Sequence, residues 1–392
     1  MKYVDEYRDP VAAKALLERI KKLAAKLETP LAFMEICGGH THTIYRHGLE
    51  HLLPKNLELI HGPGCPVCVI PLGRVDDAGW LARQPGVIFT TFGDMMRVPG
   101  TQGSLQQAKA QGCDIRFVYS PLDALQIARE NPHAEVVFFA VGFETTAPST
   151  AVALDRAEKE GIENFSIFCN HVRIEPPLRA ILGLDQGRIK GFIGPGHVAT
   201  IAGTKAFEFI PREYNLPVVV TGFEPLDILQ AVEMLIEQYV SGRVASGHAE
   251  VENQYARVVL PEGNTAALNL MAKVFEHRDT FEWRGLGFIP DSGFKIATAY
   301  AKYDAEKRFD LPNLRVSDPP SCQCGQVLTG SLKPWQCGVF GTACTPANPV
   351  GTCMVSPEGA CAAYYNFGRV DPAVAAALVQ LPKFTGICWD TQ

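Results

Sequence analysis

The hydrophobic positions of the chain first follow helical spacing and then gather into short continuous runs. One apolar stripe with helical spacing consists of Leu16, Ile20, Leu23 and Leu27. It follows Asp9 and Pro10, residue types that favour the N-cap and the first turn of a helix. The pattern therefore predicts a first helix that ends before Pro30.

Eight short apolar runs follow this helix. They are Leu31–Ile36, Leu57–Ile60, Val87–Phe92, Ile115–Tyr119, Val136–Phe143, Phe165–Phe168, Gly191–Ile193 and Val218–Thr221. Stretches with a helical pattern lie between them, at Ser104–Gln111, Pro121–Asn131 and Ser149–Gly161. Because continuous apolar strands that alternate with helices are typical of parallel sheets covered on both faces, we predict an α/β fold.

Eight strands suit one large sheet or two smaller ones, and a repeated motif favours two. The segment Gly142-Phe143-Glu144-Thr145 is echoed by Gly222-Phe223-Glu224-Pro225. We therefore expect two similar parallel-sheet α/β domains, residues 30–120 and 121–245. The alternation fades after about residue 245, where Gly, Pro and Cys dominate. We assign residues 246–392, together with 1–29, to a loop-rich C-terminal domain organised around its cysteines.

Composition narrows the class of protein. The 392 residues are 47% hydrophobic and 20% charged, which is typical of a globular domain protein. A net charge of -6 without basic clusters argues against nucleic-acid binding. The charged start lacks the apolar segment of a secretory signal, and no apolar stretch is long enough to span a membrane. We therefore expect a cytoplasmic protein.

Half of the 12 cysteines fall in one short C-terminal segment. They are Cys322, Cys324, Cys337, Cys344, Cys353 and Cys361. Because cytosolic thiols stay reduced, such a cluster indicates metal ligands or redox thiols. The spacing matches neither the paired knuckles of zinc ribbons nor a compact ferredoxin motif, so zinc and iron–sulfur both remain open.

Further cysteines follow two of the predicted strands. The first strand runs into Cys37, Gly38, Gly39 and His40, and the second runs into Cys65-Pro-Val-Cys68. Ligands bind at the carboxyl ends of parallel strands, and thiolate with imidazole suits iron, zinc or copper. We therefore predict a joint site. Cys65 and Cys68 have the spacing of redox pairs and of zinc half-sites, with a structural turn as the alternative. His40 is either a ligand or a residue that orders the turn.

Taken together, these motifs resemble the HypD family of hydrogenase maturation factors. The segments that carry the resemblance are CGGHTHTIYRHGLEHLLP, HGPGCPVC, GFETTAP and CQCGQVLTGSLKPWQCGVFGTACTPANPVGTCMVSPEGAC. They extend from residue 37 to residue 361 and so cover nearly the whole chain.

The resemblance implies a scaffold that assembles the Fe(CN)₂CO unit of [NiFe]-hydrogenases. Family members act with the small chaperone HypC and receive cyanide equivalents from HypE. By this resemblance Cys37 would hold the iron together with a HypC cysteine, and Cys65 and Cys68 would form a redox pair beside it. Residues 30–120 would then be the domain that carries the iron-assembly cysteines.

The resemblance also assigns the C-terminal cysteines to two groups. It implies that their domain is an iron–sulfur domain. A [4Fe–4S] cluster would be bound by Cys322, Cys337, Cys344 and Cys361. Cys324 and Cys353 would form a dithiol or disulfide beside it. Because two extra thiols lie within this frame and two more lie beside Cys37, we hypothesise that electrons pass from the cluster to Cys324 and Cys353, and then to Cys65, Cys68 and the iron site. A stand-alone iron–sulfur thiol–disulfide oxidoreductase and a zinc-stabilised α/β binding module are the alternatives.

Overall fold

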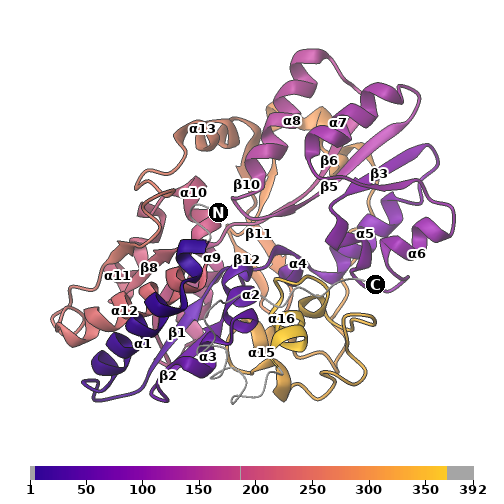
Figure 1. The fold of residues 1–392 in the computed structure, drawn as a ribbon. Helices are drawn as coiled ribbons and strands as arrows, with labels where there is room; N and C mark the ends of the chain where they lie inside the picture. Colours follow the sequence, from indigo (N-terminus) through magenta and orange to yellow (C-terminus); the bar gives the residue numbers. More distant parts are fainter. Residues whose placement is uncertain (1–4, 186, 369–392) are drawn as a thin grey trace.

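The structure is a computed structural model that describes residues 5–185 and 187–368. It contains two large sheets, and every strand pair within them is parallel (Figure 1). The predicted α/β class is therefore confirmed. The part of the predicted C-terminal domain that covers residues 369–392 lies outside the described residues.

The first sheet has the strand order β2-β1-β7-β8-β9. Its strands are β1 (Leu31–Glu35), β2 (Leu57–His61), β7 (Ile189–Pro195), β8 (Val218–Thr221) and β9 (Val251–Asn253). Glu35 lies opposite His61 at the carboxyl ends of β1 and β2. Residues distant in sequence therefore meet along one edge of this sheet.

The second sheet has the order β4-β3-β5-β6. Its strands are β3 (Val87–Thr91), β4 (Ile115–Phe117), β5 (Glu135–Gly142) and β6 (Phe165–His171). All eight apolar runs expected from the sequence are thus strands. The two motifs that echo each other follow β5 and β8, so they mark strand ends in different sheets.

Helices connect and cover these strands. In the first half of the chain they are α1 (Pro10–Ala24), α2 (Gly38–Arg46), α3 (Leu49–Leu52), α4 (Pro66–Val69), α5 (Leu72–Leu81), α6 (Leu105–Ala110), α7 (Pro121–Glu130), α8 (Ala147–Glu160) and α9 (Glu175–Leu184). They continue with α10 (Gly196–Ala202), α11 (Phe209–Tyr214), α12 (Pro225–Val240), α13 (Thr265–Val274), α14 (Ala305–Arg308), α15 (Cys324–Leu328) and α16 (Ala360–Phe367). No helix of the described residues is long and apolar enough to cross a membrane.

The strands are not divided at residue 120 as the sequence suggested. β3 and β4 precede this position but lie in one sheet with β5 and β6, whereas β7 returns to pair with β1 and carries β8 into that sheet. Parallel partners are chosen by tertiary packing across long crossovers, and similar apolar runs do not reveal which strand pairs with which. The predicted assignment of strands to residues 30–120 and 121–245 is corrected accordingly.

The first helix also packs against a different part of the chain than predicted. α1 begins at Asp9, whose side chain accepts a hydrogen bond from the Val11 N–H. Its apolar face, including the fully buried Ile20, packs with α12 and the first sheet in one core rather than with the C-terminal cysteines. The expected grouping of residues 1–29 with the cysteine-rich segment is therefore wrong.

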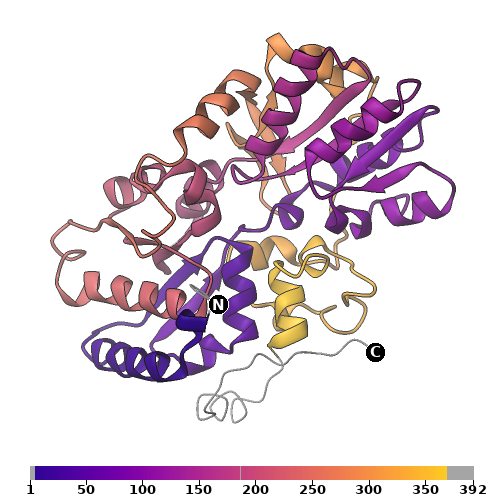
Figure 2. The same ribbon diagram turned by 45° about the horizontal axis from the view of Figure 1, so that its top comes forward.

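Two small antiparallel pairs precede the cysteine-rich segment. They are β10 (Phe275–His277) with β13 (Phe294–Ile296), and β11 (Thr280–Trp283) with β12 (Gly287–Pro290). The segment itself is loop-rich, as expected, and contains α15 and α16. Helix α16 packs on α2, which directly follows Cys37, so the cysteine-rich segment lies beside the Cys37 turn (Figure 2).

The packing of α1 leads to a prediction about the free energy of unfolding. Replacing Ile20 with Ala removes a fully buried side chain, and we expect the free energy of unfolding to fall by about 2–5 kcal/mol. Val11 on the same helix is 76% exposed, so Val11→Ala should change it by less than about 0.5 kcal/mol. Equal effects of the two substitutions in chemical denaturation would show that α1 does not pack on α12 as described.

Candidate functional site

Cys37 and Cys65 lie in loops that touch at one edge of the first sheet. Cys37 follows β1, Cys65 follows β2, and these strands are neighbours. The Gly38 N–H donates a hydrogen bond to the Gly64 carbonyl (3.1 Å), and a side chain on Gly64 would place its Cβ 2.3 Å from the Cys37 nitrogen. Only glycine therefore lets the two cysteine loops approach so closely.

The Cys37 thiol is buried at the start of α2. The Cys37 N–H donates to the Glu35 carboxylate (3.1 Å), and Sγ lies 3.9 Å from His197 Nδ1. Burial and then the nearby Glu358 raise the pKa of the Cys37 thiol. The free thiol therefore keeps its proton at neutral pH, and a bound metal ion would have to displace that proton.

Two histidines near this turn stack on one aromatic ring. Phe223 stacks on His197 with ring centroids 3.9 Å apart and on His40 at 4.8 Å. His40 Nε2 lies 3.3 Å from the Thr221 carbonyl, and burial lowers the pKa of this histidine to about 4. Among the described residues, His197 and not His40 is the imidazole in contact with the Cys37 thiol. The sequence predicted the strand at Gly191–Ile193 that leads to His197, but it did not identify His197 as a site residue.

A buried network beneath the Cys37 turn also escaped the sequence analysis. Glu35 is fully buried and accepts hydrogen bonds from the Thr41 hydroxyl and from His61 Nδ1, the latter at 2.7 Å. His61 Nε2 in turn bonds the Tyr45 hydroxyl. This network fixes β1, β2 and α2 against one another. A glutamate at the end of an otherwise apolar strand was the signal available in the sequence.

Cys65 and Cys68 lie at the N-cap and inside the short helix α4. Pro66 occupies the first turn between them, and Cys68 is fully buried. The Thr352 hydroxyl of the cysteine-rich segment donates to the Cys68 carbonyl (2.8 Å). Burial and then the neighbouring thiols of Cys353 and Cys65 raise the pKa of Cys68 well above its ordinary value.

Cys353 joins this pair to the C-terminal cysteines. It is fully buried, and its thiol interacts with those of Cys68, Cys324 and Cys361. The Cys322 thiol donates a hydrogen bond to Cys324 Sγ (3.2 Å). The thiols therefore form a continuous series from α4 to the cysteine-rich segment, buried except for the partly exposed Cys322.

Most of the C-terminal cysteines face one small pocket. Five of them line it: Cys322, Cys324, Cys337, Cys344 and Cys361. A side chain on Gly351 would place its Cβ 2.3 Å from Cys322 Sγ and 2.5 Å from Cys324 Sγ, so glycine keeps the space beside these sulfurs open. Within the described residues, no three Cys, His, Asp or Glu side chains converge tightly enough to hold a single metal ion.

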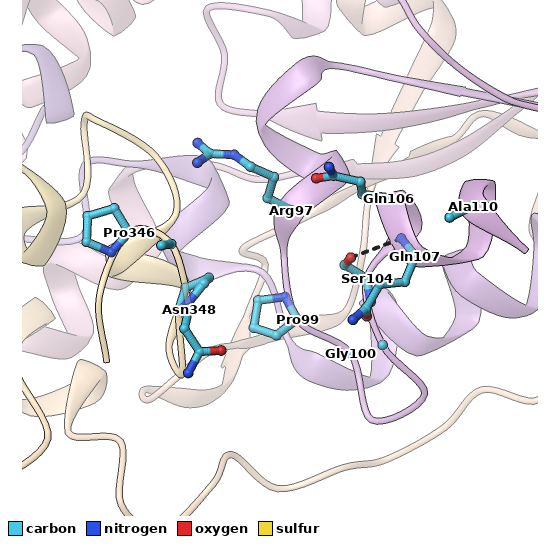
Figure 3. A pocket seen from close by; sticks show the side chains of 12 residues that line it. Arg97, Pro99, Gly100, Ser104, Gln106, Gln107, Ala110, Pro346 and Asn348 are labelled. Atoms are coloured by element: carbon cyan, nitrogen blue, oxygen red, sulfur yellow. Dashed lines mark hydrogen bonds between the residues drawn. The ribbon is translucent and has the colours of Figure 1, made fainter. Parts of the chain in front are cut away.

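A larger hollow of about 560 Å³ lies beside the cysteine-rich segment (Figure 3). The described residues that line it lie between Arg97 and Ala110 on one side and between Pro346 and Pro349 on the other. They include neither a thiol nor a carboxylate. Arg97 also donates a hydrogen bond to the Val355 carbonyl (2.8 Å), which ties the first wall to the cysteine-rich segment. This hollow therefore lacks the groups that hold iron.

The GFETTAP turn after β5 provides a buried carboxyl group. Glu144 accepts a hydrogen bond from the Ile174 N–H (3.0 Å) through one oxygen, and its other oxygen has no hydrogen-bond partner in the described structure. Burial raises the pKa of Glu144 to about 7. A carboxyl group with such a pKa exchanges protons at neutral pH and is often found at functional sites.

Comparison with known proteins places this arrangement in context. The family model HypD, described as "Hydrogenase formation hypA family", matches residues 11–368. A "Hydrogenase maturation factor HypD2" of Bradyrhizobium diazoefficiens is 54% identical over 376 residues, which cover 94% of this chain and 97% of that protein.

Two further relatives are similar along their whole length. A "Hydrogenase maturation factor HypD" of Rhodobacter capsulatus is 53% identical, with 94% of this chain and 98% of that protein aligned. A protein of the same name in Escherichia coli is 50% identical over the same shares of the two chains. The chain therefore belongs to the HypD family of hydrogenase maturation factors.

Proposed function

We propose that this protein assembles the Fe(CN)₂CO unit of [NiFe]-hydrogenases on Cys37 and supplies electrons to it through its buried thiols. A chaperone of the HypC type and a cyanide donor of the HypE type are the proposed partners, as the family resemblance implies. The observation that carries the proposal is the continuous series of thiols that leads from the loop beside Cys37 to the C-terminal cysteine pocket.

The iron being loaded is the substrate of this site. Thiolate is the soft donor that such iron favours, and the Cys37 thiol points towards His197 at 3.9 Å. Burial lowers the pKa of His197, so its imidazole is neutral and able to accept a proton or to donate a lone pair. We propose that His197 accepts the Cys37 proton as iron binds, since Glu358 and burial otherwise hold that proton in place.

The residues around the C-terminal pocket fit a [4Fe–4S] cluster. The four thiols implied by the resemblance, Cys322, Cys337, Cys344 and Cys361, all line it. Gly351 leaves room beside the sulfurs of Cys322 and Cys324, and four thiolates are the ligand set that such a cluster takes. When bound, such a cluster would transfer single electrons.

The thiols between the pocket and the iron turn would then carry reducing equivalents. Cys353 interacts with Cys324 on one side and with Cys68 on the other. A disulfide formed by Cys353 with either thiol releases two protons and two electrons, and its cleavage takes them up again. Because Cys353 neighbours both, thiol–disulfide exchange there would connect Cys324 with the Cys65 and Cys68 pair.

Burial disfavours the alternative of a stand-alone oxidoreductase. Exchange with an outside disulfide needs an accessible thiolate. Cys65, Cys68 and Cys353 are all buried, and the pKa of Cys68 is raised. This burial supports exchange among these thiols rather than exchange with an external protein.

Replacing Cys37 tests the iron site. In the complex with the HypC-type chaperone, Cys37→Ala should abolish the infrared bands of iron-bound CN and CO because the thiolate ligand is missing. The iron and sulfide content of the C-terminal pocket and the folded fraction should not change. Cys113→Ser, which alters a thiol outside the series, should keep the bands. Bands that persist in Cys37→Ala would show that the iron is bound elsewhere, with Cys65 or Cys68 as the next candidate ligands.

Replacing Cys353 tests the thiol series. Cys353→Ser keeps the size of the side chain but breaks the series between Cys324 and Cys68. We expect the purified protein to retain its iron–sulfur absorption while hydrogenase maturation falls to background in cells that depend on it. Normal maturation by this variant would contradict the electron path but leave the iron site at Cys37 standing.

A further inference from the structure

One arginine is buried beside the cysteine pocket without enough partners. Arg284 follows strand β11 and is only 2% exposed. Transfer of an ionised group into the interior costs several kcal/mol unless opposite charge and hydrogen bonds compensate for it. A guanidinium at this depth therefore requires acceptors for its five N–H groups.

The described residues supply only part of what Arg284 requires. Its Nε lies 2.8 Å from Asp318 Oδ1, but without the alignment of a hydrogen bond. Nη1 and Nη2 have no hydrogen-bond acceptor among the described residues. Asp318 itself is 27% exposed and so contributes a partly screened charge. The positive charge of Arg284 is therefore incompletely matched.

The backbone around Arg284 links both groups of cysteines. The Arg284 N–H donates to the carbonyl of Val69 (2.8 Å), the residue after Cys68. Gly285 lies so close to Gly325, the residue after Cys324, that a Cβ on it would be 2.3 Å from the Gly325 Cα. The turn between β11 and β12 thus lies between the two thiol segments.

The turn that carries Arg284 also adjoins the pocket. Gly325, which this turn contacts, directly follows Cys324, and Cys324 lines the pocket. The buried Arg284 side chain, whose terminal nitrogens lack acceptors among the described residues, is therefore carried by a turn next to one wall of the pocket.

We propose that Arg284 is a positioning residue that stabilises anionic sulfur in the C-terminal cysteine pocket, with its unpartnered N–H groups available to the thiolates of the bound cluster. The inference rests on the proposed function, because neutral thiols do not provide the missing negative charge. A cluster held by four thiolates provides it. Arg284 would stabilise the reduced state of the cluster more than the oxidised state, since reduction adds one more negative charge to the pocket.

Two substitutions of the same ion pair separate this role from a purely structural one. Arg284→Gln removes the positive charge and should lower the reduction potential of the cluster. Asp318→Asn removes the competing negative charge and should raise it. If the pair only anchored the loop before Cys322, both substitutions would disturb the same contact and act in the same direction.

The experiment is a dithionite titration of the full-length, anaerobically purified protein, followed by electron paramagnetic resonance. For Arg284→Gln we expect the one-electron reduction constant to fall about tenfold, which corresponds to about 59 mV. Arg284→Lys should show a smaller shift, because it keeps the charge. Arg19→Gln, a substitution on the exposed face of α1, controls for net charge and should leave the potential unchanged.

Each outcome decides one part of the argument. Opposite shifts in Arg284→Gln and Asp318→Asn support the inference, and unchanged potentials or shifts in one direction overturn it while the proposed function stands. If Arg284→Gln does not retain the cluster, the sign of the Asp318→Asn shift still decides. Wild-type protein without iron and sulfide would overturn the proposed cluster and this inference together.

Discussion

The parallel pairing of β1 with β2 is the constraint on which the rest of the site depends. It brings the carboxyl ends of two strands to one edge, where Glu35 and His61 meet directly. The loops that follow these strands carry Cys37 on one side and Cys65 on the other, and their glycines allow backbone contact. A shift of this register by one residue would turn the side chains to the opposite faces and separate the two loops.

The second constraint is the burial of the thiols. Burial raises the pKa of Cys37 and Cys68, so free thiols there remain protonated and unreactive towards solvent. A metal ion, or a neighbouring cysteine, then becomes the reaction partner that burial permits. The cysteine-rich segment returns to α4 through the bond from Thr352 to the Cys68 carbonyl, and this contact joins the two thiol groups.

Local patterns in the sequence were sufficient for the strands, the first helix and the cysteines. Continuous apolar runs reflect burial on both faces, and the N-cap of α1 depends only on Asp9 and Pro10. Which strands belong to which sheet could not be predicted, because β7 returns to β1 over more than a hundred residues and no local signal encodes that pairing. His197 and Arg284 were missed for the same reason, since each reaches the cysteines only through tertiary contacts.

The central claim is that Cys353 bridges the thiols of α4 and those of the C-terminal pocket. Mild oxidation of a variant that combines Cys65→Ser with Cys324→Ser tests it most directly, because Cys68 and Cys353 then lack their other proposed partners. After digestion, mass spectrometry should detect a disulfide between the peptides that contain Cys68 and Cys353. Recovery of both cysteines as free thiols, with the fold intact, would contradict the continuous path.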